Sequence, residues 1–123
     1  MEDGATPQRD ERFPKSARLL DGTDFRSVTA AGRKIGGRFF LLFALATVCS
    51  NARLGLTVSR KVGKAVVRTR VKRQMREFFR RNRPELADGL DFVLIARPQA
   101  GGATSEALRR DLQKLFASFI RPL

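Results

Sequence analysis

The sequence predicts an α+β or α/β fold in which helices cover a single β-sheet. An alternating segment at 53–60 and an apolar run at 91–96 predict strands, and a long amphipathic pattern at 65–81 between them predicts a helix. With 123 residues, 42% of them hydrophobic, the chain suits one domain with a modest core. The expected order is helix, two or three strands, helix, strand, helix.

The N-terminal part begins with a segment that lacks periodicity. Residues 1–12 are polar and include Gly4 and Pro7, so we expect a disordered tail, with the domain at 13–123. The acidic and polar character of this tail is not that of a signal peptide. Helix signals occupy 20–32, with Asp21 as a capping residue.

The remaining elements follow from apolar runs and breakers. Gly36-Gly37 predicts a turn, and the aromatic-rich run at 39–45 predicts a strand behind it. The strand at 91–96 stops before Pro98. A last helix starts at Ser105, capped by Ser105 or Thr104. Five of its residues have core spacing: Leu108, Leu112, Leu115, Phe116 and Phe119.

Charge is the unusual feature of the composition. Lys and Arg number 25 against 12 Asp and Glu, a formal net charge of +13. No acidic residue lies between Asp24 and Glu77, so the charges are segregated. Such a protein repels itself unless a polyanion binds it; nucleic acid is the first candidate and an anionic membrane surface the second. The longest apolar run, 39–46, is far shorter than the roughly 20 residues of a membrane helix, so we expect no membrane span.

The predicted helix at 65–81 has two different sides. At about 100° per residue, an apolar stripe forms that should pack on the sheet. Its members are Val67, Val71, Met75, Phe78 and Phe79. The opposite side carries Thr69, Lys72, Arg73, Arg76 and Arg80, with Arg68 at one border and Arg70 and Arg81 at the other.

Four basic residues of this helix follow one another at i, i+4 spacing: Arg68, Lys72, Arg76 and Arg80. Each like-charged pair costs about 0.2–0.5 kcal/mol in an isolated helix. Solvated helix faces normally alternate in sign, and only Glu77 offers relief here. The column therefore predicts phosphates along this helix, and hence nucleic-acid binding.

The chain lacks the commonest catalytic groups. It has no His, and its single cysteine, Cys49, has apolar neighbours and is expected to be a buried, inert thiol. Residues 62–64 contain a Gly-Lys pair without the other positions of a phosphate-binding loop, and no zinc-ligand spacing occurs. We therefore expect no catalysis by the isolated chain, no metal site on it, and a reducing, cytoplasmic location.

One segment resembles a known signature. Residues 53–77 read RLGLTVSRKVGKAVVRTRVKRQMRE, which resembles the bacterial ribonuclease P protein component. In that family a strand ending in Ser-basic-Lys leads through a Gly loop to Ala-Val, Arg-Asn-Arg and a basic helix. A looser similarity covers about 13–119, including Asp24-Phe25 and the late strand that begins at Asp91.

This resemblance implies a fold and a function. The fold is a single α+β domain with a four-stranded mixed sheet, order α-β-β-β-α-β-α, of the ribosomal protein S5 domain 2-like kind. Its βαβ crossover would be left-handed, against the general rule. The function is that of the protein subunit of ribonuclease P. Its partners would be the ribonuclease P RNA, which uses Mg²⁺ to remove the 5′ leader, and precursor tRNA. No organic cofactor and no homo-oligomer are required.

The resemblance also implies site residues. Those expected to bind the catalytic RNA are Arg68, Thr69, Arg70, Lys72, Arg73, Arg76 and Arg80. Those expected in a leader-binding cleft are Phe25, Phe43, Thr57, Arg60, Lys61 and Lys64. This sequence departs from the family at three of its positions: Thr69 and Lys64 each stand where Asn is usual, and Thr29 where an aromatic is common. Thr69 lacks the two donors of an amide.

Two alternatives of other classes remain at this stage. A small basic ribosomal protein or RNA chaperone would share the size and charge but would not process tRNA. A membrane-surface protein could use a basic amphipathic helix, although the apolar stripe at 67–79 is needed to cover the sheet.

Overall fold

The computed structural model describes residues 22–47, 52–82, 86 and 89–120. The expected tail at 1–12 and Cys49 lie outside the described residues. The helices and strands are α1 (Gly22–Ala31), β1 (Arg33–Gly36), β2 (Phe40–Ala46), β3 (Arg53–Thr57), α2 (Ala65–Asn82), β4 (Leu90–Ala96) and α3 (Ser105–Phe116). Short 3-10 turns, η3 (Arg60–Val62), η5 (Pro98–Gly102) and η6 (Ala117–Phe119), follow β3, β4 and α3.

The four strands form one mixed sheet in the order β1-β2-β4-β3. β2 pairs antiparallel with both β1 and β4, whereas β3 and β4, the strands that flank α2 in sequence, run parallel. This confirms the predicted fold class and shows that three strands precede α2, because Arg33–Gly36 pairs with β2. The left hand of the crossover stays a prediction.

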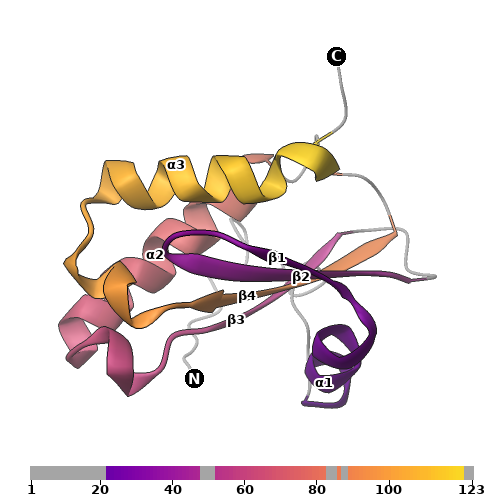
Figure 1. Cartoon of the computed structure of the whole chain (residues 1–123), viewed down its shortest axis with the longest axis horizontal. Coiled ribbons are helices and arrows are strands. Elements are labelled where there is room, and N and C mark those ends of the chain that lie inside the picture. Colours follow the sequence, from indigo (N-terminus) through magenta and orange to yellow (C-terminus); the bar gives the residue numbers. More distant parts are fainter. Residues whose placement is uncertain (1–21, 48–51, 83–85, 87–88, 121–123) are drawn as a thin grey trace.

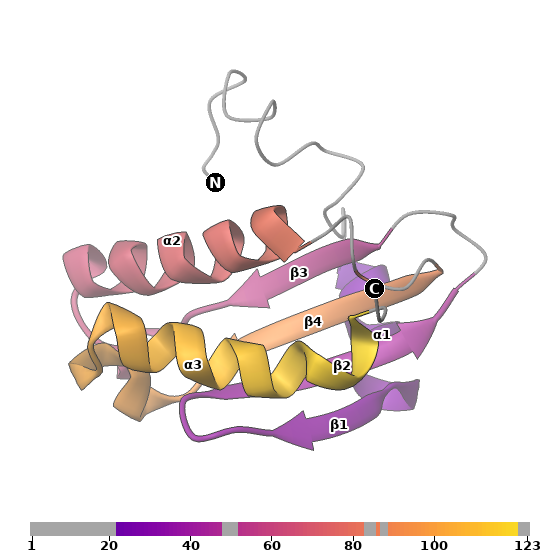
Figure 2. The same ribbon diagram turned by 90° about the horizontal axis from the view of Figure 1, so that it is seen from above.

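The helices are divided between the two faces of the sheet. α2 and α3 lie side by side over one face, and α1 lies on the other, toward one end (Figures 1 and 2). β2 shows the division in its burial, since Phe40, Leu42 and Ala44 are buried in the main core while the residues between them are half-buried. The main core therefore lies between the sheet and the α2–α3 pair.

The apolar stripe of α2 packs into this core as predicted. Val71, Met75, Phe78 and Phe79 are buried, and Val67 packs against them. Phe rings from three elements meet there: the Phe116 centroid lies 5.5 Å from that of Phe78 and 5.2 Å from that of Phe92. Each fully buried large apolar side chain contributes about 1.5–3 kcal/mol. This burial uses the apolar side of α2 that a membrane-surface helix would need.

The last helix is capped by Thr104, one of the two predicted caps. Its Oγ1 accepts a hydrogen bond of 3.0 Å from the N–H of Ala107. α3 ends at Phe116, so Phe119 reaches the core from the 3-10 turn η6 instead, with its ring centroid 5.4 Å from that of Phe92.

A buried carboxylate on α3 holds the turn between β1 and β2. The Asp111 oxygens accept hydrogen bonds from three consecutive backbone N–H groups, those of Arg38, Phe39 and Phe40, at 3.0, 2.9 and 3.2 Å. A buried charge is tolerated when it is hydrogen-bonded in this way. Sequence reasoning missed Asp111, because nothing local to α3 indicates which turn it meets.

Candidate nucleic-acid interface

The sheet face that carries α1 gathers three of the six predicted leader-contacting residues, Phe25, Phe43 and Thr57. We call it the α1 face and define it by the strand residues that alternate with those in the main core. These are Lys34, Gly36, Leu41, Phe43, Leu45, Arg53, Gly55, Thr57, Asp91, Val93 and Ile95. Arg53 marks the side, since its guanidinium lies 3.8 Å from the carboxylate of Asp24 in α1.

Two rows cross all four strands on this face. One contains Gly36, Leu41, Ile95 and Thr57, and the other contains Lys34, Phe43, Val93 and Gly55. Phe43 and Thr57 therefore lie on the same face, one row apart, and both are half-buried. On α1, Phe25 is also half-buried and lies three residues before the buried Val28, on the same side of the helix. The structure thus places these three predicted leader residues on one side of the sheet.

An ion pair between Arg53 and Asp91 lies at the end of the α1 face that is nearest to Asp24 of α1. Arg53 donates to both carboxylate oxygens of Asp91, from Nε at 2.8 Å and from Nη2 at 2.6 Å. Asp91 is only 4% exposed, and Arg53 and Asp91 face each other in the parallel β3–β4 ladder. Sequence reasoning placed both residues in strands but missed their pairing, which depends on strand order.

The basic residues that follow β3 lie beyond its C-terminal end rather than on the sheet. Ser59 accepts a hydrogen bond from the N–H of Lys61 at its Oγ, 3.3 Å away, and so begins η3. Gly63 then adopts φ 154°, a backbone conformation that favours glycine, before α2 starts. Arg60, Lys61 and Lys64 are all exposed around this turn.

The two arginines at the start of α2 also hold loops of the protein. Arg68 Nε donates to the Gly63 carbonyl at 3.2 Å, and Arg70 Nη2 donates to the Gly101 carbonyl in η5 at 3.1 Å. η5 and η3 approach so closely that a Cβ at Gly101 would overlap the Val62 carbonyl oxygen. Arg68 and Arg70 therefore fix the η3–η5 junction, whereas Thr69 between them is exposed.

The charge repulsion expected along α2 acts on Lys72. Partial burial lowers the pKa of its ammonium below the ordinary 10.5, and the positive charges of Arg76 and Arg68 lower it further. Both arginines are one helical turn away, at i+4 and i−4. An anion bound along this column would relieve the same repulsion.

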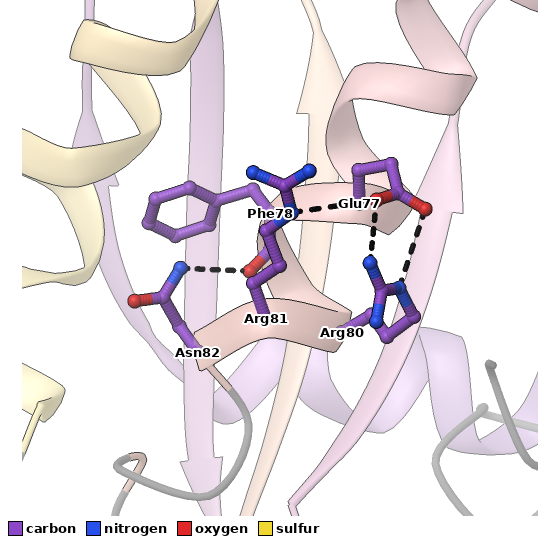
Figure 3. A network of polar contacts seen from close by, with 5 residues as sticks. All are labelled: Glu77, Phe78, Arg80, Arg81 and Asn82. Carbon is purple, nitrogen blue, oxygen red and sulfur yellow. Dashed lines mark hydrogen bonds and ion pairs between the residues drawn. The ribbon is translucent and has the colours of Figure 1, made fainter.

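Glu77 offsets the positive charge at the C-terminal end of the basic column on α2. Its carboxylate accepts from Arg80 Nη2 at 2.8 Å and Nε at 3.3 Å, and it lies 3.5 Å from Arg81 Nε (Figure 3). This hydrogen bonding and the negative charge raise the pKa of Arg80. Asn82 completes the helix end by donating to the Phe78 carbonyl at 2.9 Å (Figure 3). Arg73, in contrast, projects from α2 as an exposed side chain.

These features define a class of small basic α+β protein. It has one mixed sheet, with the basic helix α2 and its neighbour α3 on one face and α1 on the other, half-buried face. No described helix combines the length and apolar character needed to cross a bilayer. Comparison with known proteins narrows the class. The ribonuclease P family model matches residues 13–119. The chain therefore belongs to the ribonuclease P protein family.

Individual relatives agree with this assignment. A ribonuclease P protein component from Desulforapulum autotrophicum is 38% identical over 109 residues, covering 89% of this chain and 93% of the relative. One from Bacillus cereus is 36% identical over 103 residues, 83% of this chain and 90% of the relative. The Staphylococcus aureus RNase P protein superposes with a TM-score of 0.79 at 28% identity, over 85% of this chain and 95% of that one. The Thermotoga maritima protein gives 0.74 at 30% identity, over 83% and 96%.

Proposed function

We propose that this chain, as a ribonuclease P protein subunit, binds the catalytic RNA through α2 and the 5′ leader of precursor tRNA along the α1 face. The RNA would carry out the Mg²⁺-dependent cleavage that gives the mature 5′ end. Family membership supports the role in tRNA processing and the work with ribonuclease P RNA. It favours this reading over a ribosomal protein or RNA chaperone. The cytoplasm is the expected place of action.

The exposed basic side of α2 is the observation that carries the RNA-binding part of the proposal. Burial of the Val71–Phe79 stripe fixes the rotation of the helix, so Thr69, Arg73 and Arg76 are exposed. Partial burial and, to a smaller extent, the positive charges of Arg76 and Arg68 lower the pKa of Lys72. Phosphates along this side would replace repulsion by attraction, and binding would release counterions.

The α1 face supports the leader-binding part. Single-stranded nucleic acid is held by a basic surface along its backbone and by side chains on which bases stack. Phe43 on β2 and Phe25 on α1 are half-buried aromatic side chains on this side of the sheet. Thr57 on β3 offers a hydroxyl one row away from Phe43. Arg60 and Lys61 supply positive charge where β3 ends.

The chain's own residues would bind and position RNA rather than perform hydrolysis. The 123-residue sequence contains no His. Within the described residues, no three Asp, Glu or Cys side chains gather in a way that could hold a metal ion. We therefore assign no Mg²⁺ ligand to this chain and leave the ion, and the phosphodiester chemistry it supports, to the RNA. The protein would lower the repulsion between polyanionic substrate and polyanionic catalyst.

Reconstitution with a bacterial ribonuclease P RNA and a precursor tRNA tests the proposal. Cleavage at low Mg²⁺ and low salt should require this chain, and one copy per RNA should suffice. Cleavage by the RNA alone at the same rate under these conditions would contradict it. A leaderless tRNA serves as the control, and it should bind with the same affinity whether or not the α1 face carries substitutions.

A further inference from the structure

β1 is an edge strand, and the C-terminal half of α3 runs beside it in the opposite direction. The Asp111 carboxylate on α3 accepts from the N–H groups of Arg38 and Phe39, which follow β1. At the other end, Phe119 in η6 lies under the guanidinium of Arg33, the first residue of β1. Figure 2 shows α3 and β1 running in opposite directions, with β3 at the far edge of the sheet. These two contacts define which side of α3 is turned toward β1.

Three exposed basic side chains lie on this side of the molecule. We call them the β1–α3 patch: Arg33, Arg38 and Lys114. At about 100° per residue, Lys114 is about 60° around α3 from Asp111. It lies on the side of Asp111 away from Phe116, whose ring meets that of Phe78 in α2. The patch therefore faces away from α2.

The positive charge of the β1–α3 patch is not offset within the described part of the chain. There, no carboxylate lies within ion-pair distance of its three cations. Asp111 is buried and accepts from backbone N–H groups, and Glu106 pairs with Arg110 at 2.8 Å. Arg110 is about 100° from Asp111 and is not part of the patch. An uncompensated group of cations attracts a polyanion.

The aromatic rings at the patch are covered by its arginines. The Arg38 guanidinium lies 5.2 Å from the Phe39 centroid, and that of Arg33 lies 5.9 Å from the Phe119 centroid. Both rings also pack against the main core. A site for single-stranded RNA needs rings on which bases stack, whereas a guanidinium over a ring still has N–H donors for phosphate oxygens. The patch consequently suits helical RNA, which proteins bind mostly through its shape, phosphates and 2′-hydroxyls.

The β1–α3 patch and the basic side of α2 lie toward opposite edges of the sheet. α2 packs beside β3 at one edge, and β1 forms the other. Three strand spacings of about 4.8 Å separate the two edge strands by about 14 Å, and α3 lies between α2 and the patch. An RNA segment bound along α2 therefore leaves the patch for a different segment.

We propose that the β1–α3 patch binds phosphates of a second double-helical segment of the ribonuclease P RNA. The inference rests on the proposed function, since it takes the RNA bound along α2 as the source of this segment. Once α2 is bound, another segment of the same molecule meets the patch at a high effective concentration. The domain would then hold two RNA segments at a fixed separation and offset the repulsion between their phosphates.

Binding of the chain to ribonuclease P RNA, without substrate, tests the patch. Arg38→Gln combined with Lys114→Gln should weaken binding about tenfold. It should also reduce the slope of log Kd against log salt by about 1.8, which is about 0.9 for each of two phosphates on a duplex. The charge-preserving pair Arg38→Lys and Lys114→Arg should keep the wild-type slope. The matched control is Arg109→Gln, because Arg109 is exposed on α3 about 160° around the helix from Asp111; it should leave the slope unchanged.

A tethered cleavage reagent identifies the RNA segment at the patch. Cys49 is the single cysteine of the sequence, so Cys49→Ser allows an iron chelate to be attached through Lys114→Cys, Arg73→Cys or Arg109→Cys. The complex contains ribonuclease P RNA and precursor tRNA. The chelate at position 114 should cut a helical segment of the ribonuclease P RNA that the chelates at positions 73 and 109 leave intact.

The outcomes separate this inference from the proposed function. An unchanged salt slope in the Arg38 and Lys114 double variant would overturn the role of the patch. Cuts from position 114 that fall only in precursor tRNA, or in the segment cut from position 73, would overturn the assignment to a second segment. A wild-type chain that does not bind ribonuclease P RNA would instead contradict the proposed function. Thermal unfolding should be unchanged in the double variant, since both residues are exposed.

Discussion

Arg53 and Asp91 stand directly opposite each other in the parallel ladder of β3 and β4 and share two hydrogen bonds, of 2.8 and 2.6 Å. The pair joins the strands on either side of the α2 crossover. Their side chains are 19% and 6% exposed, so water screens the interaction little. The nearby carboxylate of Asp24 brings α1 to the same guanidinium.

Removal of the buried partner should destabilise the fold strongly. Asp91→Ala leaves the Arg53 guanidinium without its main acceptor, and we expect a loss of about 3 kcal/mol in the free energy of unfolding. Urea unfolding measures it. The matched control is Glu106→Ala, which removes the exposed Arg110 pair on α3 and should cost under about 1 kcal/mol. Equal losses for both variants would contradict a structural role for Asp91.

The carboxylate of Asp111 should matter for the β1–β2 turn. Asp111→Ala leaves three backbone N–H groups without their acceptor, and we expect a loss of about 2–4 kcal/mol in the free energy of unfolding. Hydrogen exchange of the Arg38–Phe40 amides should accelerate more than that of α2. Gln113→Ala, an exposed neighbour on α3, is the control and should change neither quantity.

Arg73 offers a clean test of the basic helix, because it is exposed. Arg73→Ala should leave the melting temperature unchanged, weaken binding to ribonuclease P RNA and reduce the salt slope by about 0.7–0.9 for the lost phosphate contact. Adding Arg68→Ala should reduce the slope further. This second change should also lower stability, since Arg68 holds the Gly63 carbonyl. If the salt slope of RNA binding is unchanged in the double variant, α2 does not contact the RNA phosphates.

Glu77 should limit RNA affinity at the end of α2. Glu77→Gln removes the negative charge beside Arg80 and Arg81, so RNA binding should tighten and its salt slope should steepen by about 1. The loss of these partly exposed ion pairs should cost under about 1 kcal/mol in stability. The measurement is a salt titration of the Kd, with Glu106→Gln on α3 as the control. Weaker binding would show that Glu77 orients the arginines instead.

Lys72 should report on charge along the helix. Because its pKa in the folded protein is lowered, the unfolded state binds more protons as pH approaches 10.5 from below. Its contribution therefore favours folding increasingly as pH rises through this window. Arg76→Gln should raise the Lys72 pKa, though not fully to 10.5, since burial is the larger cause. NMR titration of the lysine side chains measures it. Arg109→Gln should leave this pKa unchanged.

Much of the fold follows from local patterns in the sequence. The period of 3.6 residues identified α2 and its buried side, and the alternation at 53–58 correctly assigned Leu54 and Val58 to the core. The density of charge on α2 and the signature at 53–77 indicated the RNA-binding class and the family. These features are visible in sequence because each depends on residues a few positions apart.

The tertiary structure decided which distant residues meet. Asp111 holds a turn 71 to 73 residues earlier, and Arg53 meets Asp91 across 38 residues. Arg97 lies over Gly36 only because the strand order is β1-β2-β4-β3, with β2 between their strands. No periodicity encodes these pairs, because they result from the order and register of strands that the chain reaches only after folding. The sequence by itself determined the basic helix and its family, whereas the structure determined how charge is distributed along the α1 face.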